Sequence, residues 1–527
     1  MDCVSATHQQ TPLWIVPELL AKTRPGNGWQ TLLASALLLV VGAMDAVAEE
    51  QFLRQRERDR ALRQQLDTHP DIRSSAPVKD DSTLPVGETP CFTIRSILLT
   101  GDSAEQFQWS LDSVNAGSDP AVGRCLGANG VNLAMRRIQD AIIARGYVTT
   151  RVLAAPQDLR AGLLTLTLIP GRIGTIRFAP GTSGRANAWN AAPVSPGQLL
   201  NVRDIEQALE NFKRVPTAEA DIQITPAQTA SVTSAHSDVV IAWSQKRPAR
   251  LSVSVDDSGS KGTGKYQGNL TLSLDDPLSL NDLFYTNLTH DLGGGEPGKR
   301  GSRGHTLYYS LPLGYWALSL TNSEYGYHQT VAGANVPYLY RGESRSNELR
   351  MTRLLYRDAH RKTSAWSSLW TRSSENFIDD TEIELQRRRM AGWEAGLNHR
   401  EYLGTSTLEL STGYRRGTGA HHALAAPEEA IGEGTSRSAI ITASSQLQIP
   451  FALYQQPLTY VAGLRAQWNR TPLVPQDRFS IGSRYTVRGF DGESILSAER
   501  GWTLRNELAL NLGASGQQVY AGVDAGR

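Results

Sequence analysis

The chain has 527 residues, with 53 Lys and Arg against 52 Asp and Glu, and only 3 Cys. Because the charge is almost balanced, the sequence lacks the basic excess that proteins use to neutralise nucleic-acid phosphates. A charged fraction of 20% beside 40% hydrophobic residues excludes a largely disordered chain, and three cysteines are too few for a disulfide-rich scaffold of this length.

The first predicted element is a secretory signal peptide over residues 1–48. An apolar run at 31–44 follows Lys22 and Arg24 and precedes the small-x-small sequence AVA at 46–48. This run is too short to span a bilayer comfortably as a helix, and its flanks are those of a cleavable export signal. A buried core helix is the alternative, and the long segment before the run leaves the true start codon open.

Cleavage after Ala48 would remove Cys3 and leave Cys91 and Cys125 in an exported, oxidising setting. An even pair in that setting favours one disulfide over two buried free thiols.

Residues 49–67 predict a helix, because they are rich in helix-forming residues and contain no glycine or proline. The charges lie on almost every face, so this helix is either solvated or enclosed in a polar cavity. Residues 68–90 contain four prolines among polar residues, which indicates an extended linker.

Two small α+β modules are predicted next, over residues 91–172 and 173–247. In the first, the helix over 133–145 is accompanied by strands over 92–99, 147–153 and 163–169. In the second, a helix that begins at Asn201 is accompanied by strands over 173–178, 220–225 and 238–243.

From residue 248 to 527 the sequence alternates between apolar and polar residues in segments of about ten residues. Near the end, Trp502, Leu504 and Leu508 alternate with polar residues that include Arg505 and Glu507. Charged residues on the second face suit a water-filled lumen, so a membrane β-barrel is favoured over a soluble sandwich. Aromatic residues near strand ends suit an interfacial girdle: Tyr315, Trp316, Tyr325, Tyr327, Tyr338 and Tyr340.

The sequence contains only weak matches to nucleotide-binding and metal-binding motifs. Residues 259–265 approach a phosphate-binding loop, but Tyr266 stands where Ser or Thr is needed, so a hairpin turn is expected. His421 and His422 lie among Gly and Ala without further ligands, which indicates a solvated loop. We therefore expect no enzyme activity, no cofactor and no metal.

Two segments near the end are harder to explain as packing. The first is Val487-Arg488-Gly489-Phe490, within a long connection between strands. The second is GVDAG at 522–526, where strand parity turns Asp524 toward the lumen. A partly dehydrated carboxylate needs a partner, which an arginine on an infolded loop could supply through two hydrogen bonds.

These segments, with GWTLRNEL at 501–508 and GVDAGR at 522–527, resemble the two-partner secretion transporters, the hemolysin-activator group of the BamA-like superfamily. Residues 144–173 and 199–224 are similar to the two POTRA domains of that family. The resemblance implies a plug helix at 49–67, a periplasmic linker at 68–90, POTRA domains at 91–172 and 173–247, and a 16-stranded barrel whose sixth extracellular loop folds inward.

The resemblance also implies roles for individual residues. Arg488, in the motif Val487 to Phe490, matches the arginine at the loop tip, and Asp524 matches its partner on the barrel wall. Cys91 and Cys125 fall where the family's first POTRA domain carries a disulfide.

The implied function is export across the Gram-negative outer membrane, without ATP, of one large exoprotein held through its N-terminal secretion domain. A hemolysin, an adhesin and a contact-dependent inhibition toxin remain open as that partner. The family further implies a monomer that the barrel assembly machinery inserts into lipid. The alternatives are an insertase of the same superfamily, a binding module or adhesin that uses the loops at 326–345 and 417–437, and a non-functional truncated product.

The last alternative has a specific basis. About 13 strand-like segments can be counted after residue 250, whereas single-chain bacterial barrels have an even number. The family pattern continues beyond DAGR with about three more strands and a terminal aromatic residue. The sequence is therefore expected to be a fragment or the product of a frameshifted gene.

Overall fold

The computed structural model describes residues 48–66, 70–74, 82–116, 118–227, 235–333, 335–490, 492–513 and 516–527. The predicted signal peptide, apart from Ala48, lies outside these residues, as do residues 75–81 of the predicted linker. Residues 48–66 are helical, close to the helix expected over 49–67. Within the described residues, no helix combines the length and apolarity needed to cross a bilayer.

The first α+β module has a three-stranded sheet in the order β2-β5-β4, with β2 and β5 parallel. Ile138 and Ile142 of its long helix pack against Leu164 and Leu166 of β5, and all four side chains are fully buried. The elements are β1 (Phe92–Thr93), β2 (Ser96–Gly101), η1 (Ala104–Leu111), α3 (Asp112–Asn115), β3 (Cys125–Leu126), α4 (Ala128–Ala144), β4 (Arg151–Leu153), η2 (Leu159–Ala161) and β5 (Leu163–Ile169).

Helix α4 begins five residues before the expected position at 133 because a distant carboxylate caps it. Glu88 accepts hydrogen bonds from the backbone N–H groups of Gly127, Asn129 and Gly130, at 2.8, 2.9 and 3.0 Å. A negative charge at a helix N-terminus satisfies otherwise unpaired N–H groups and interacts favourably with the helix dipole. The cap lies about 40 residues away in sequence, so local pattern could not reveal it.

The second module contains β6 (Arg172–Phe178), α5 (Val202–Phe212), β7 (Ala218–Pro226) and β8 (His236–Gln245), with the sheet order β6-β8-β7. Helix α5 begins as predicted, because the Asn201 side chain accepts a hydrogen bond from the N–H of Arg203. Phe212 of α5 and Ile241 and Trp243 of β8 are buried in the core.

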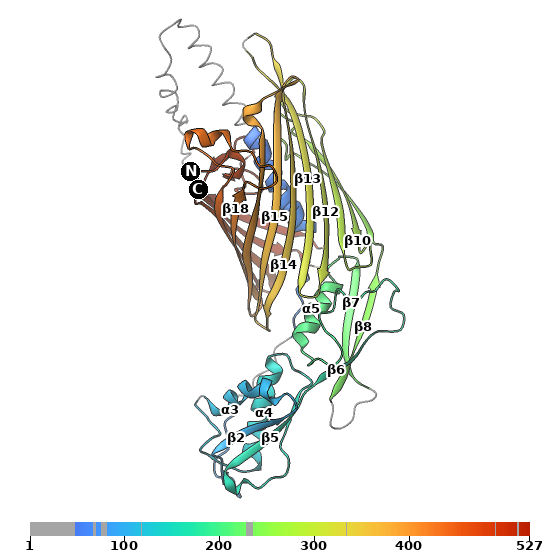
Figure 1. Ribbon diagram of the computed structural model, residues 1–527, viewed down its shortest axis with the longest axis vertical. Coiled ribbons are helices and arrows are strands. Elements are labelled where there is room, and N and C mark those ends of the chain that lie inside the picture. The colour runs from blue at the N-terminus through green and yellow to red at the C-terminus, as the bar shows by residue number, and fades with distance from the viewer. Residues whose placement is uncertain are drawn as a thin grey trace. The chain divides into compact units, whose positions relative to one another are not determined.

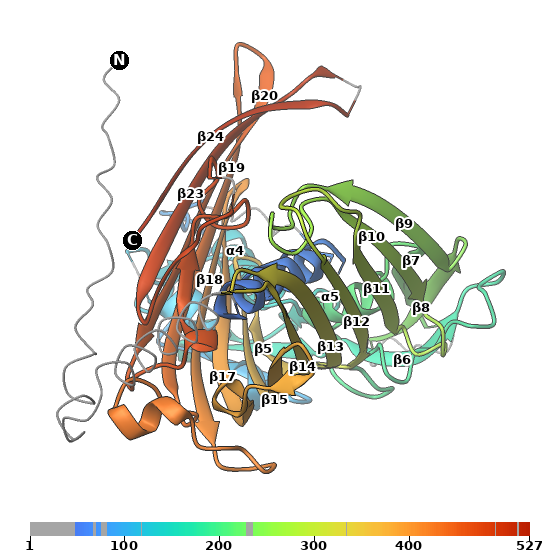
Figure 2. The ribbon, with the colours of Figure 1, turned by 90° about the horizontal axis from the view of Figure 1, so that it is seen from above.

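The rest of the chain forms one antiparallel sheet of 14 strands, curved into a barrel wall as Figures 1 and 2 show. Short β16 (Thr381–Glu382) lies off the main path beside β15. The remaining thirteen follow one another in chain order: β9 (Ala249–Asp256), β10 (Gln267–Asp275), β11 (Leu283–Asp291), β12 (Arg300–Leu313), β13 (Trp316–Val331), β14 (Tyr338–Arg357), β15 (Arg361–Ile378), β17 (Arg388–Leu403), β18 (Ser406–Thr418), β19 (Ala439–Leu453), β20 (Gln456–Asn469), β23 (Gly501–Asn511) and β24 (Gln518–Gly526).

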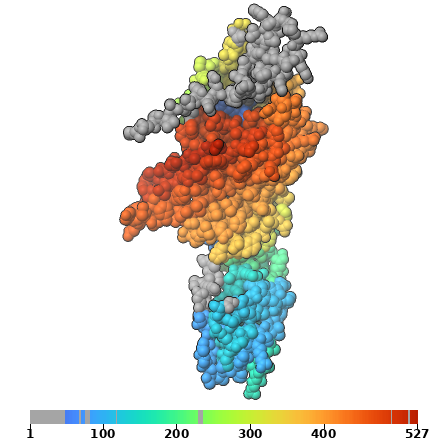
Figure 3. Space-filling model, turned by 90° about the vertical axis from the view of Figure 1, so that its left-hand side faces the viewer, coloured from blue at the N-terminus to red at the C-terminus, as the bar shows by residue number. Residues whose placement is uncertain are grey.

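The two faces of this sheet differ in the way the alternating sequence predicts. Leu251, Val253 and Val255 of β9 are exposed on the convex face, at 68%, 71% and 65%, which suits contact with lipid. Thr271 and Ser273 of β10 are buried on the opposite face. One side of the molecule shows the C-terminal strands, orange to red, as a continuous outer surface (Figure 3).

The predicted aromatic girdle is wrong for three of its six residues. Tyr325, Tyr327 and Tyr340 are at most 8% exposed. Their rings follow one another with centroids 6.1 Å apart in each pair, the first pair stacked and the second tilted. The Tyr340 hydroxyl donates to Oε1 of Gln386 at 2.9 Å. These rings therefore belong to the interior. The other three, Tyr315, Trp316 and Tyr338, are 37–39% exposed.

Residues 52–66 of the N-terminal helix lie on the concave side of the sheet, shown in blue in Figure 2. Arg63 pairs with Glu348 of β14 at 2.8 Å, and Glu57 pairs with Arg465 of β20 at 2.8 Å. Arg56 donates to the backbone oxygens of Gln476 and Arg478 at 3.2 and 3.0 Å. The polar helix thus finds polar partners on several strands, which resolves the choice between a solvated and an enclosed helix.

Candidate functional site

The VRGF motif lies in a loop, residues 482–495, that a small hairpin holds at its base. Strands β21 (Phe479–Ile481) and β22 (Leu496–Ala498) pair antiparallel there. Within the loop, the N–H of Ser483 donates to Oγ1 of Thr486 at 3.1 Å, and the N–H of Thr486 donates to the Ser483 oxygen at 3.0 Å. This compact turn fixes the position of the next two residues, Val487 and Arg488.

Arg488 and Asp524 are brought together by three hydrogen bonds. The guanidinium Nε and Nη2 donate to the two carboxylate oxygens at 2.8 and 2.9 Å, and the backbone N–H of Arg488 donates at 2.9 Å. The Asp524 side chain is 2% exposed. A buried carboxylate with a bidentate arginine and an additional N–H donor is held in one orientation.

Glu507 and Arg505 of β23 extend this contact into a network of four charged residues. Glu507 accepts from Nη1 of Arg488 at 2.5 Å, and Nε of Arg505 lies 4.0 Å from Asp524. In the sheet register, Arg505 is directly opposite Asp524. Two arginines and two carboxylates leave no net charge, so the cluster is electrostatically balanced where the loop meets β23 and β24.

The remaining motif residues have different environments. Val487 is 7% exposed and Phe490 is 63% exposed. Gly489 has φ +98°, a left-handed conformation that residues with a side chain rarely adopt. A Cβ on Gly522 would come within 2.6 Å of Nη2 of Arg488. The wall is therefore shaped for the guanidinium, while the Phe490 ring is left exposed at the loop tip.

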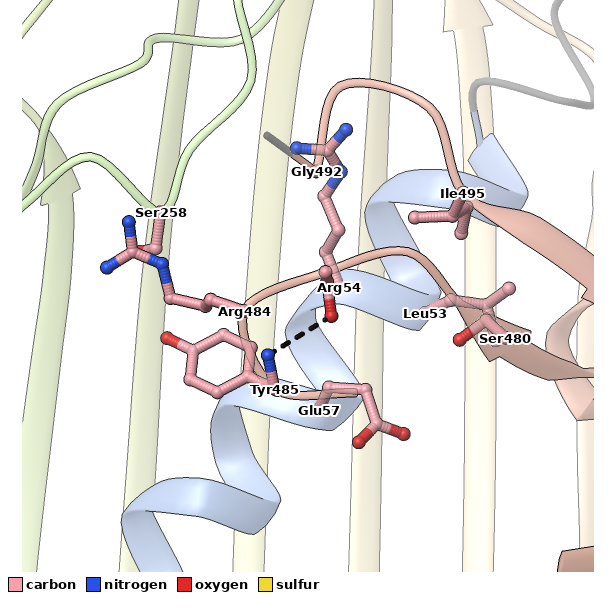
Figure 4. A pocket seen from close by; sticks show the side chains of 10 residues that line it. Leu53, Arg54, Glu57, Ser258, Ser480, Arg484, Tyr485, Gly492 and Ile495 are labelled. Carbon is pink, nitrogen blue, oxygen red and sulfur yellow. Dashed lines mark hydrogen bonds between the residues drawn. The ribbon is translucent and has the colours of Figure 1, made fainter. Parts of the chain in front are cut away.

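The same loop also contacts other parts of the molecule. Arg484 pairs with Asp257, which lies directly after β9, and Glu493 accepts from the N–H of Lys261 at 3.0 Å. A small pocket lies between the loop and the N-terminal helix, lined by Arg54 and Glu57 from the helix and by Arg484 and Tyr485 from the loop (Figure 4). The contacts of Asp257, Glu493 and Glu57 could not be predicted from the sequence, because charges in surface-like segments carry no local signal of a partner far along the chain.

Residues 259–265 join β9 to β10. His421 and His422 lie in the exposed connection between β18 and β19, and no cluster of three potential metal-binding side chains occurs among the residues the structure describes. Cys91 and Cys125 form a disulfide beside the short pair of β1 and β3.

Comparison with known families settles the identity of the fold. The sequence model described as haemolysin secretion/activation protein ShlB/FhaC/HecB matches residues 235–527. The chain belongs to this family. POTRA models match residues 92–171, in the ShlB-type form, and residues 172–226, so the two α+β modules are POTRA domains.

Individual relatives agree with this assignment. The chain is 35% identical to the outer membrane transporter CdiB-2 of Burkholderia pseudomallei over 92% of this chain and 84% of the relative. It is 25% identical to the hemolysin transporter protein ShlB of Serratia marcescens over 77% and 71%. The structure of CdiB from Acinetobacter baumannii superposes with a TM-score of 0.79 at 31% identity, covering 92% of this chain and 88% of the other.

The chain is therefore a two-partner secretion transporter of the outer membrane, with its POTRA domains in the periplasm, and it exports a partner exoprotein. The family does not favour the insertase alternative. The antiparallel sheet of this chain, with an apolar outer face and a polar helix on its concave side, suits a transporter that lies in the outer membrane.

Proposed function

We propose that the inward loop and the enclosed helix control a pore through which the exported protein passes unfolded. The observation that carries this proposal is the three-fold attachment of Arg488 to Asp524. It ties a 14-residue loop, 482–495, to one edge of the barrel wall. A buried charge pair costs several kcal/mol to break when one partner is removed, so the loop would stay in place while the helix beside it moves.

The partner is proposed to be a large exoprotein, a hemolysin, an adhesin or a contact-dependent inhibition toxin. Its N-terminal secretion domain would bind the POTRA domains, whose sheet edges can accept an extended segment. Folding of the partner outside the cell would draw the chain forward without ATP, since a folded product cannot return through the pore. The transporter itself would act as a monomer, without catalysis, after insertion by the barrel assembly machinery.

Replacement of Arg488 tests the role of the loop. Arg488→Ala should leave the amount of barrel in the outer membrane unchanged, because the sheet pairs through its backbone. Export should fall at least tenfold, because Asp524 and Glu507 lose their common partner and the loop is released. The measurement is the amount of partner protein in the culture medium relative to transporter in the membrane.

Arg484→Ala is the matched control for this experiment. Arg484 lies in the same loop, but it and its partner Asp257 have side chains 43% and 55% exposed, and exposed ion pairs contribute little. Export by this control should stay near the unaltered level. Normal export by Arg488→Ala would overturn the proposed role of the loop.

A further inference from the structure

A cluster of charged side chains where α5 of the second POTRA domain meets the turn between β14 and β15, named the charged groove, holds part of the linker by its backbone. Glu206 and Glu210 lie one turn apart on α5, and therefore on the same face of the helix. Arg357 and Lys362, at the turn between β14 and β15, lie opposite them. Arg357 is 3.0 Å from each of Glu206 and Glu210, and Lys362 is 2.5 Å from Glu210.

These side chains are almost completely removed from water. Arg357, Glu206 and Glu210 are 5%, 3% and 6% exposed, and Lys362 is 22% exposed. A third cation, Arg203 of α5, lies 2.6 Å from Glu206, so the two acids face three bases. Each carboxylate has about four lone-pair sites, more than the bonds it receives from these cations, so capacity remains for further N–H donors.

Linker residues 70–74 use that capacity through main-chain atoms. The N–H of Ile72 donates to Oε1 of Glu210 at 3.1 Å, and the N–H of Ser74 donates to Oε1 of Glu206 at 2.5 Å. The backbone oxygen of Ile72 accepts from Arg357. Donors two residues apart on one side are the pattern of an extended strand, and all three bonds are independent of side-chain identity.

The neighbouring linker side chains contact the end of β17. Asp71 pairs with Arg400 at 3.3 Å, and the Arg73 guanidinium lies 4.4 Å from the centre of the Tyr402 ring. These contacts depend on sequence, unlike those in the groove. The linker is thus held by two sets of bonds, and the set in the groove could be made by any extended chain.

We propose that the charged groove is a binding site for an extended polypeptide of the exported protein, and that residues 70–74 occupy it until export begins. The identity of that occupant rests on the proposed function. Residues 52–66, just before the linker, contact the barrel wall, so withdrawal of the helix would pull on the linker. Departure of the linker frees acceptor sites on Glu206 and Glu210 and a donor on Arg357, which a new extended backbone can fill.

The test uses the full-length purified chain and a fluorescent peptide with the sequence of residues 69–76. In the unaltered chain the tethered linker should exclude the peptide. The double variant Ile72→Pro, Ser74→Pro removes both linker N–H donors, so its affinity for the peptide should rise at least tenfold. Thr83→Pro is the matched control, because it adds a proline to the linker outside the groove contacts. This variant should bind the peptide as weakly as the unaltered chain does.

Two further probes test whether the groove binds backbone groups and whether it accepts an unrelated sequence. A peptide methylated on the backbone nitrogens of Ile72 and Ser74 should not bind the double variant. Reduced and carboxymethylated lactalbumin, an unfolded chain of unrelated sequence, should displace the fluorescent peptide, whereas native lactalbumin should not. Unchanged affinity in the double variant, or equal binding of the methylated peptide, would overturn a backbone-reading groove.

Displacement by the linker peptide alone, with no effect of the unfolded protein, would overturn the proposed occupant. No step of this measurement requires export. Its failure is therefore distinguishable from a failure of the proposed gating by Arg488, which is read from secreted protein.

Discussion

The attachment of Arg488 depends on a residue that has no side chain. Gly522 lies on the same face of β24 as Asp524, and its Cα faces the arginine rather than a cavity. Because a Cβ at this position would approach Nη2 of Arg488 to 2.6 Å, a close fit between loop and wall replaces the usual packing of side chains.

Gly522→Ala should therefore reduce export several-fold while the barrel still assembles. The added methyl group would displace the guanidinium and lengthen its bonds to Asp524. The measurement is secreted partner relative to transporter in the membrane, as for Arg488→Ala. Gly463→Ala is the control, since a Cβ on that strand glycine would meet nothing within 4 Å. Equal export by both alanine variants would contradict the argued close fit.

Alternation along a strand predicts which face of the sheet each side chain lies on. It predicted that Asp524 faces inward, and Asp524 is buried against the loop. Tyr325 and Tyr327 have opposite parity to Leu320, which is 50% exposed on the outer face. The same rule would have placed both tyrosines inside, although their position near a strand end suggested a girdle.

At the scale of elements, the first POTRA domain combines a small core with a covalent link. The disulfide between Cys91 and Cys125 closes a separation of 34 residues, just before α4 begins. Glu88, which caps that helix, lies three residues before Cys91. The link therefore keeps the capping segment close to the helix that it stabilises.

Removal of the disulfide should destabilise this domain. For a loop of this length, the loss of constraint on the unfolded chain corresponds to about 3–4 kcal/mol. Cys91→Ser in the full-length chain should make the first POTRA domain cleavable by protease at lower urea concentration. The second POTRA domain and the barrel should keep their resistance.

Cys3→Ser is the control for that measurement, because Cys3 lies in the predicted signal peptide. Reductant added to the unaltered chain should reproduce the effect of Cys91→Ser. If the first POTRA domain resists protease equally in Cys91→Ser, in Cys3→Ser and in the reduced unaltered chain, its core and the Glu88 cap are sufficient for its stability without the disulfide.

At the scale of the whole molecule, the second POTRA domain is joined to the barrel through the turn between β10 and β11. Asn187 donates to the Ser279 oxygen at 3.0 Å, and Arg185 lies 3.7 Å from Asp276. Burial, and the neighbouring carboxyl of Asp282, raise the pKa of Asp276 to about 6. The Asp276 side chain is only 1% exposed.

This pKa predicts a pH dependence for the contact. An acid whose pKa is higher in the folded state contributes stability that is complete below its ordinary value of 3.8 and is lost as pH rises through about 6. Hydrogen exchange of residues 276–282, corrected for the intrinsic rate, should thus be slower at pH 5 than at pH 7.5.

Asp276→Asn should remove that difference, since an amide does not titrate. The protected state of the variant should resemble that of the unaltered chain at low pH. A difference between pH 5 and pH 7.5 that persists in Asp276→Asn would assign the effect to another group.

The sequence by itself determined the class of fold, the family and most elements, because these follow from local patterns. Strand β5 matches the range predicted over 163–169, and Asn201 begins α5 as expected. Period-2 alternation sufficed to separate the outer face from the inner face, and the pairing of two exported cysteines followed from their number and compartment.

Only the tertiary structure decided which distant charges meet. Glu88 at α4, Glu57 with Arg465, and Arg357 with α5 join residues tens to hundreds of positions apart. Charged residues in polar segments look alike in sequence, because solvation and pairing satisfy them equally well until the fold excludes water. That exclusion, rather than residue type, distinguishes the loop attachment and the charged groove from ordinary surface.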